Sequence, residues 1–136
     1  MTAAEKIQSA VFNVLNADPT LSGLVEGVYV GPQKPKGIKN PVVLLFTRTF
    51  ESTQLGALHI TFFEIVVRSD TSEGEGSVMS QIANRVDTLL RNVHFSKDGA
   101  SGTLNRRGFP VHPALFDDVE KDWFKRWTYQ SIVKKS

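Results

Sequence analysis

Cysteine is absent from this chain of 136 residues, and histidine, tryptophan, tyrosine and methionine each occur only two or three times. The lack of cysteine excludes disulfide scaffolds, thiol nucleophiles and zinc sites built on cysteine. No apolar run approaches the roughly 18 residues that a membrane-spanning helix needs, and the first residues lack the apolar core of a signal peptide. We therefore expect a protein without a membrane segment that works where it is synthesised.

Patterns that carry catalysis are missing as well. The three histidines, His59, His94 and His112, lie far apart in the sequence and show no metal-ligand spacing. The acidic residues within 117–122 do not follow the pattern of a calcium loop. The glycine-rich segment 73–77 lacks the Gly-Lys-Ser/Thr ending of a phosphate loop, and its two glutamates would repel an anion. The sequence thus predicts no enzyme, no bound metal and no cofactor.

The charge balance is close to neutral. Sixteen basic and 14 acidic residues give a net charge of +2, whereas a dedicated nucleic-acid-binding domain is usually more basic. Five cations could still contact phosphates: Lys34, Lys36, Lys39, Arg106 and Arg107. A small nucleic-acid-binding domain therefore stays open as an alternative from a different functional class.

Apolar periodicity predicts two main helices. The first covers residues 3–15, with Thr2 as its N-cap and Glu5 at the spacing of a capping box. The second covers about 75–93. Its apolar stripe consists of Val78, Met79, Ile82, Ala83, Val86, Leu89, Leu90 and Val93.

The remaining segments are typical of strands and turns. Strand-like runs occupy 28–30, 41–52, 57–69, 107–112, 114–119 and 123–133, and a turn rich in glycine, serine and asparagine is expected over 96–105. The order predicts an α+β fold, in which two main helices pack on one face of a largely antiparallel β-sheet. Residues 1–136 then form a single domain.

Two strands need further interpretation. In 57–69 the apolar face changes between Phe62 and Phe63, which indicates either a β-bulge or a strand covered on both faces. In the last run, Trp123 and Trp127 share a face. Such tryptophans are either core residues or anchors of a subunit interface.

The order of these features resembles the tail-completion, or tail-terminator, proteins of long-tailed bacteriophages and related prophages. The resemblance covers nearly the whole chain. The segments that carry it are Leu15-Asn16-Ala17-Asp18-Pro19-Thr20-Leu21, Val28-Tyr29, Asn40-Pro41-Val42-Val43-Leu44, Ile65-Val66-Val67-Arg68-Ser69, Ile82 to Leu90 and Trp127-Thr128-Tyr129-Gln130-Ser131-Ile132.

This resemblance implies a non-enzymatic structural protein of the virion tail or neck, assembled in the host cytoplasm. Members of that family form a ring, typically a homohexamer, that ends the tail tube and joins the tail to the head. The implied partners are further copies of the chain, a tail-tube protein and a head–tail connector protein. DNA would pass through the lumen without sequence-specific binding. Another neck or head-completion protein of similar fold is the alternative within this class.

Two charged loops are the first candidates for the joints of such a ring. Segment 31–40 carries Lys34, Lys36 and Lys39, and segment 70–76 carries Asp70, Glu73 and Glu75. Opposite charges on two loops suit a head-to-tail contact between neighbouring subunits. Trp123 and Trp127 complete the set of interface candidates.

Overall fold

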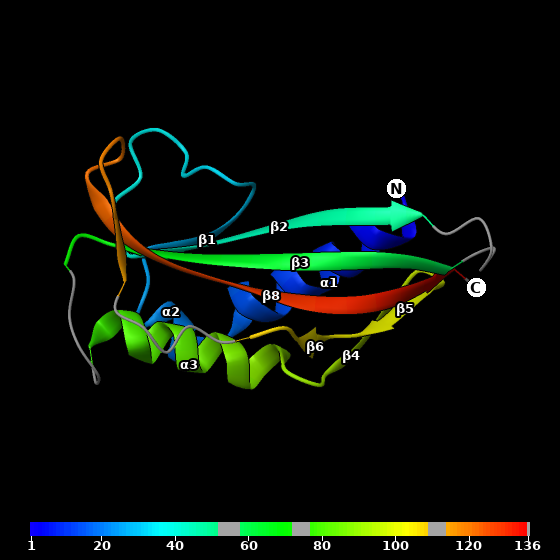
Figure 1. Cartoon of the computed structure of the whole chain (residues 1–136). Coiled ribbons are helices and arrows are strands. Elements are labelled where there is room, and N and C mark those ends of the chain that lie inside the picture. Colours follow the sequence, from blue (N-terminus) through cyan, green and yellow to red (C-terminus); the bar gives the residue numbers. More distant parts are fainter. Residues whose placement is uncertain (52–57, 72–76, 109–113, 136) are drawn as a thin grey trace.

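A computed structural model describes residues 1–51, 58–71, 77–108 and 114–135 of the chain (Figure 1). The helices are α1 (Ala3–Ala17), α2 (Pro19–Ser22) and α3 (Val78–Leu90). The strands are β1 (Gly27–Val30), β2 (Val42–Glu51), β3 (Leu58–Ser69), β4 (His94–Lys97), β5 (Ala100–Thr103), β6 (Asn105–Arg106), β7 (Leu115–Asp117) and β8 (Asp122–Lys135). None of the described helices has the length and apolar character needed to cross a membrane.

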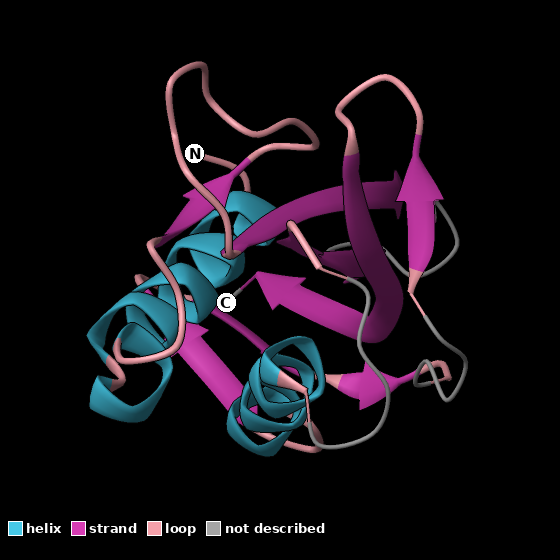
Figure 2. Cartoon of the chain, turned by 90° about the vertical axis from the view of Figure 1, so that its left-hand side faces the viewer, coloured by secondary structure: helices cyan, strands magenta, loops and turns pink. Residues whose placement is uncertain are grey.

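The strands form one sheet in the order β1-β2-β3-β8-β5-β4, and β6 and β7 also pair with β8. The pair β1–β2 is parallel and the other pairs are antiparallel. Both long helices lie on the same side of the curled sheet (Figures 1 and 2). The predicted α+β class and the largely antiparallel sheet are confirmed, with the short helix α2 added.

Local sequence signals explain where the helices begin. Thr2 accepts a hydrogen bond from the Glu5 backbone N–H at 3.1 Å, as the capping-box spacing predicts. Asp18 caps α2 in the same way, through the Leu21 N–H at 2.8 Å. Ser77 caps α3, so this helix begins at Val78 rather than near residue 75.

The segment expected to be a turn, 96–105, is the largest error of the sequence prediction. It contains most of the hairpin β4–β5, followed by β6. Asp98 and Gly99 both adopt positive φ, as a two-residue hairpin turn requires. Gly102 lies so close to β8 that a Cβ atom would stand 2.6 Å from Ser131 Oγ. Small residues were therefore a sign of close packing here, and not of a loop.

Strand β3 has no bulge. Its register with β2 and with β8 is continuous, from His59 to Arg68 and from Leu58 to Ser69 respectively. The inner face carries Phe63, Ile65 and Val67, all fully buried in the main core beneath the helices. On the outer face, a small second cluster is formed by Val42, Leu44 and Val66, with Tyr29, Ile38, Phe46 and Phe124 packed against it. The second interpretation of the apolar switch is thus correct, because part of β3 is covered on both faces.

Helix α1 contacts strands from both edges of the sheet, β1 and β4. Ile7, Val11 and Leu15 are fully buried against the sheet. At the β4 edge of the sheet, Lys97 Nζ donates to Ser9 Oγ of the helix at 2.6 Å. Lys6 Nζ of the helix donates to the Asp98 carbonyl at 2.9 Å. The helix therefore joins the first and last strands of the sheet order.

Candidate functional site

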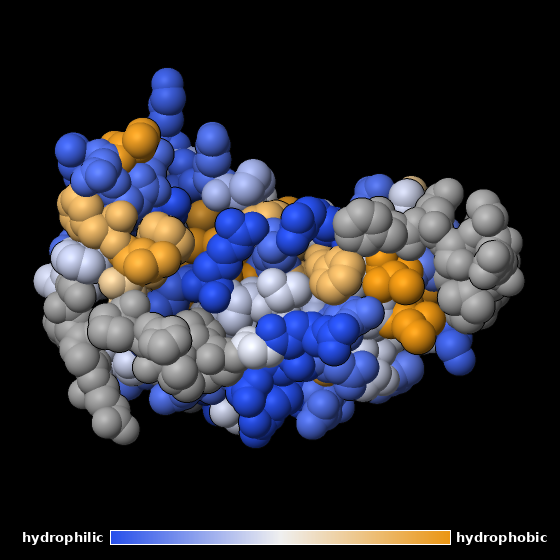
Figure 3. Space-filling view, in the orientation of Figure 1, coloured by the Kyte–Doolittle hydropathy of each residue, from blue (hydrophilic) through white to orange (hydrophobic). Residues whose placement is uncertain are grey.

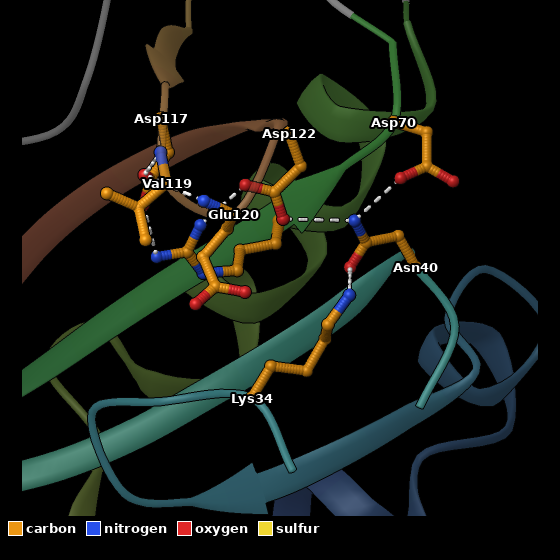
Figure 4. Close-up of polar contacts among 8 residues, drawn as sticks. Lys34, Asn40, Asp70, Asp117, Val119, Glu120 and Asp122 are labelled. Atoms are coloured by element: carbon orange, nitrogen blue, oxygen red, sulfur yellow. Dashed lines mark hydrogen bonds and ion pairs between the residues drawn. The ribbon is translucent and has the colours of Figure 1, made fainter. Parts of the chain in front are cut away.

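The end of the sheet where β3 ends and β8 begins carries a connected set of polar side chains (Figure 4). We call this set the loop-end network; its members are Lys34, Asn40, Arg68, Asp70, Asp117 and Asp122. They come from the 31–41 loop, the end of β3, the residue that follows it, and the β7–β8 hairpin.

Arg68 is the centre of this network. Its Nη1 donates to Asp122 at 2.6 Å and its Nη2 donates to Asp117 at 3.1 Å. Asp122 is only 1% exposed. Because a buried carboxylate is costly unless it is paired, the Arg68–Asp122 contact fixes the hairpin to the end of β3.

Asn40 connects the 31–41 loop to the same centre. Its Nδ2 donates to Asp122 at 3.0 Å and to Asp70 at 2.8 Å, while its Oδ1 accepts from Lys34 Nζ at 3.1 Å. The structure therefore brings two predicted interface residues, Lys34 and Asp70, together within one subunit.

This arrangement alters the expected charge pairing. The basic loop and Asp70 lie at the same end of the subunit, so they do not form the two separate surfaces that a head-to-tail contact needs. Lys36 and Lys39 are exposed at this end. Glu73 and Glu75 lie outside the described residues.

The β7–β8 turn projects beside this network. The Asp117 carboxylate accepts hydrogen bonds from the backbone N–H groups of Val119 and Glu120, at 2.9 and 3.1 Å. These bonds, with that from Arg68, lower the pKa of Asp117. The turn is thus held in one shape although Val119 is 86% exposed.

The two tryptophans, Trp123 and Trp127, differ in burial. Trp127 is 4% exposed and lies in the core of the subunit. Trp123 is partly buried and packs edge-on against Phe116, with ring centroids 5.1 Å apart. Since Phe116 is 45% exposed, Trp123 supports an exposed aromatic side chain, whereas Trp127 supports the interior.

Sequence analysis missed a buried polar chain beneath the sheet. Trp127 Nε1 donates to the Tyr129 hydroxyl at 2.9 Å, and this hydroxyl donates to Asp87 at 2.6 Å. Arg106 Nη1 donates to the other oxygen of Asp87 at 2.7 Å. Asp87 lies on the buried side of α3. A carboxylate next to an apolar helical stripe was the only sign of this in the sequence.

A second ion pair joins helices distant in the sequence. Arg85 donates to both carboxylate oxygens of Asp18, at 2.9 and 2.7 Å. The hydrogen bond from Arg85 lowers the pKa of Asp18, and the same bond raises the pKa of Arg85. This pair connects the start of α2 to the middle of α3.

The outer face of the sheet carries a third group of charges. Glu64 is 2% exposed and accepts from Arg48 at 2.7 Å and from Arg126 at 2.9 Å. The two arginine side chains are 59% and 50% exposed. Figure 3 shows apolar side chains toward both ends of this face, with polar and charged side chains between them.

The polar groups described above join different elements of the fold. Each buried carboxylate described above is paired with an arginine, and His94 Nδ1 contacts the Thr103 hydroxyl at 2.8 Å. Among the residues the structure describes, no three His, Asp or Glu side chains are grouped to hold a metal ion. His112 lies outside those residues.

Comparison with known proteins yields a similarity of fold. No protein-family model matches the sequence, and no curated protein matches it. Among solved structures, a chain of the "Virion of native gene transfer agent (GTA) particle" superposes with a TM-score of 0.74 at 20% sequence identity. The similarity covers 97% of this chain and 97% of that chain.

Proposed function

We propose that this chain is a structural, non-enzymatic protein of a phage-like virion, and that it acts as a tail terminator. In this role, copies of the chain form a ring on the last ring of the tail tube. The ring is a homohexamer, as the resemblance to the tail-terminator family implies. The ring stops tube growth and presents the surface that the head–tail connector binds. Assembly takes place in the host cytoplasm, and DNA passes through the lumen without sequence-specific contacts.

The observation that carries the proposal is the similarity of fold to a virion chain over nearly the full length of both chains. The fold similarity supports a virion protein, and the tail-terminator role is added by the resemblance in the sequence, which rests on the order and spacing of short segments.

The exposed groups also suit a protein that assembles with others. Four large apolar side chains near the two ends of the outer face are at least 45% exposed: Leu115, Phe116, Val119 and Ile132. Exposed apolar groups framed by charges are typical of interaction surfaces. In the proposed ring, Lys34, Lys36, Lys39, Asp70, Glu73 and Glu75 lie near contacts with neighbouring proteins, as does Trp123 through Phe116.

The test is removal of the gene from the genome that encodes the particle, followed by electron microscopy of the tails. A tail terminator predicts overlong tails without heads, and expression of the chain in trans restores the normal length. Tails of normal length without heads would instead indicate a head-completion or other neck protein. Normal, infectious particles would contradict a role in the virion altogether.

A further inference from the structure

The β7–β8 hairpin ends in an exposed tip that is both apolar and acidic. We define the tip as residues 115–121. Leu115 is 65% exposed and Val119 is 86% exposed, and the neighbouring Asp118 and Glu120 are exposed as well. The turn has one cation, Lys121. Because the backbone hydrogen bonds to Asp117 hold the turn in shape, the tip loses little conformational entropy when it binds.

The opposite end of the sheet carries a surface of complementary character on its outer face. We call it the outer patch: Ile60, Phe62 and Ile132, bordered by Arg48 and Lys134. Ile60 lies directly opposite Ile132 in the β3–β8 register, and Phe62 lies opposite Arg48 in the β2–β3 register. Ile132 is 50% exposed. The patch is thus an apolar centre bordered by Lys134 and by Arg48, whose side chain is 59% exposed although it pairs with Glu64.

The tip and the outer patch lie at opposite ends of β8. Asp122 and Ile132 are ten positions apart in β8, which corresponds to about 33 Å along an extended strand. The tip of one subunit is therefore out of reach of its own outer patch. Because the two surfaces are too far apart to meet within one chain, the tip can contact only the outer patch of another copy. Such a contact between two different surfaces is head-to-tail.

From this we infer that the tip of one copy docks on the outer patch of the next copy. The inference deepens the proposed ring, and it rests on that proposed function. It also supplies the second surface that the loop-end charges lack. Val119 and Leu115 would pack on Ile132 and Phe62, while Asp118 and Glu120 face Arg48 and Lys134.

The two kinds of contact contribute differently. Exposed ion pairs are individually weak, so the acidic residues of the tip set the orientation and register of the docked hairpin. Burial of the apolar side chains supplies most of the affinity. A repeated head-to-tail contact closes into a ring when the rotation between copies divides a full turn.

Cysteine crosslinking tests the contact, since the natural chain has no cysteine. Val119→Cys and Ile132→Cys are introduced together, and purified particles are treated with a short bismaleimide. The double variant is expected to give a ladder of crosslinked subunits that extends beyond the dimer. Each single variant carries one thiol per subunit, so it gives at most dimers and serves as the control.

The outcome separates this inference from the proposed function. Particles with normal tails whose double variant gives no ladder beyond the single variants would overturn the docking contact and leave the tail-terminator role intact. If removal of the gene leaves the tails normal, the function itself fails.

A second variant tests the same contact without chemical crosslinking. Val119→Asp is expected to keep the melting temperature and to abolish tail termination. Val78→Asp, at a site 40% exposed on α3, is the matched control and is expected to terminate tails normally. A Val119→Asp protein that terminates tails at the wild-type level would overturn the inference.

Discussion

The Tyr129 hydroxyl donates a hydrogen bond of 2.6 Å to the Asp87 carboxylate and so joins the central strand β8 to helix α3 in the interior. Burial is the main cause that raises the pKa of Tyr129, and the hydrogen bond to Asp87 adds to it. The hydroxyl consequently stays protonated and acts as a donor at neutral pH. Arg106 balances the charge of Asp87 from the other side.

Removal of this hydroxyl tests the buried chain. We expect Tyr129→Phe to lower the free energy of unfolding by about 1–3 kcal/mol, because Trp127 and Asp87 each lose a buried partner. Urea denaturation at neutral pH measures the change. Tyr29→Phe, at a partly buried tyrosine, is the control and should cost less than about 0.5 kcal/mol. Equal losses in the two variants would contradict a special role for Tyr129.

Acid stability should depend on Asp18. Its pKa is lower in the folded chain than its ordinary value of 3.8, chiefly because Arg85 donates to it. Such a carboxylate stabilises the fold above the pKa of the unfolded chain, and the contribution is lost as the pH falls through the lower, folded pKa. We therefore expect the melting temperature to fall more for wild type than for Asp18→Asn when the pH is lowered from about 7 to about 3. The exposed Asp118→Asn is the control and should follow wild type; parallel curves for all three proteins would disprove the assignment.

The apolar stripe of α3 predicts a large effect at Ile82, which is fully buried. Ile82→Asp places an unpaired carboxylate in the core, and we expect a loss of about 3 kcal/mol or more in unfolding free energy. Val78→Asp on the exposed side of the same helix should change stability little. A soluble Ile82→Asp variant with the wild-type melting temperature would show that the core lies elsewhere.

Close packing of β5 on β8 gives a coupled pair of substitutions. A Cβ at Gly102 would lie 2.6 Å from Ser131 Oγ, so Gly102→Ala should cost about 1–3 kcal/mol through overpacking. Ser131 Oγ is buried without a hydrogen-bond partner in the described part of the chain, so Ser131→Ala should be close to neutral. The double variant should recover part of the loss, and purely additive effects would contradict this explanation.

The basic loop gives a functional prediction. Lys36→Glu with Lys39→Glu reverses two exposed charges, and we expect a folded protein that terminates tails poorly. Lys36→Arg with Lys39→Arg retains the charge and should work normally. Tail length in a complementation assay compares the two variants. Normal tails with the glutamate variant would show that this loop is not an assembly contact.

Sequence reasoning succeeded where the determining contacts are local. The Thr2–Glu5 cap and the centre of the α3 stripe are properties of neighbouring residues, and both appear in the structure. The ends of the stripe differ from the prediction, because Val78 is 40% exposed and the helix ends at Leu90, before Val93. Sequence reasoning fails at 96–105 because glycine and serine, which are typical of loops, here allow two strands to pack closely. The Asp98-Gly99 pair in this segment is a strong hairpin signal.

The charged groups were harder to predict for a different reason. Asp18 and Arg85 are 67 residues apart, and Asp87 and Tyr129 are 42 apart. No periodicity within a segment reveals such partners, since the sheet order decides them. For the same reason, the sequence placed Lys34 and Asp70 on separate loops but contained no sign that Asn40 joins them.

The position of β8 in the sheet has a consequence for synthesis of the protein. This strand pairs with β3 on one side and with β5, β6 and β7 on the other, although all of these precede it in the chain. A ribosome must therefore complete residues 122–135 before the two halves of the sheet join. Translation products that end before this strand lack it, and with it Ile132 and Lys134 of the outer patch. Chains that stop before residue 122 therefore cannot join the two halves of the sheet.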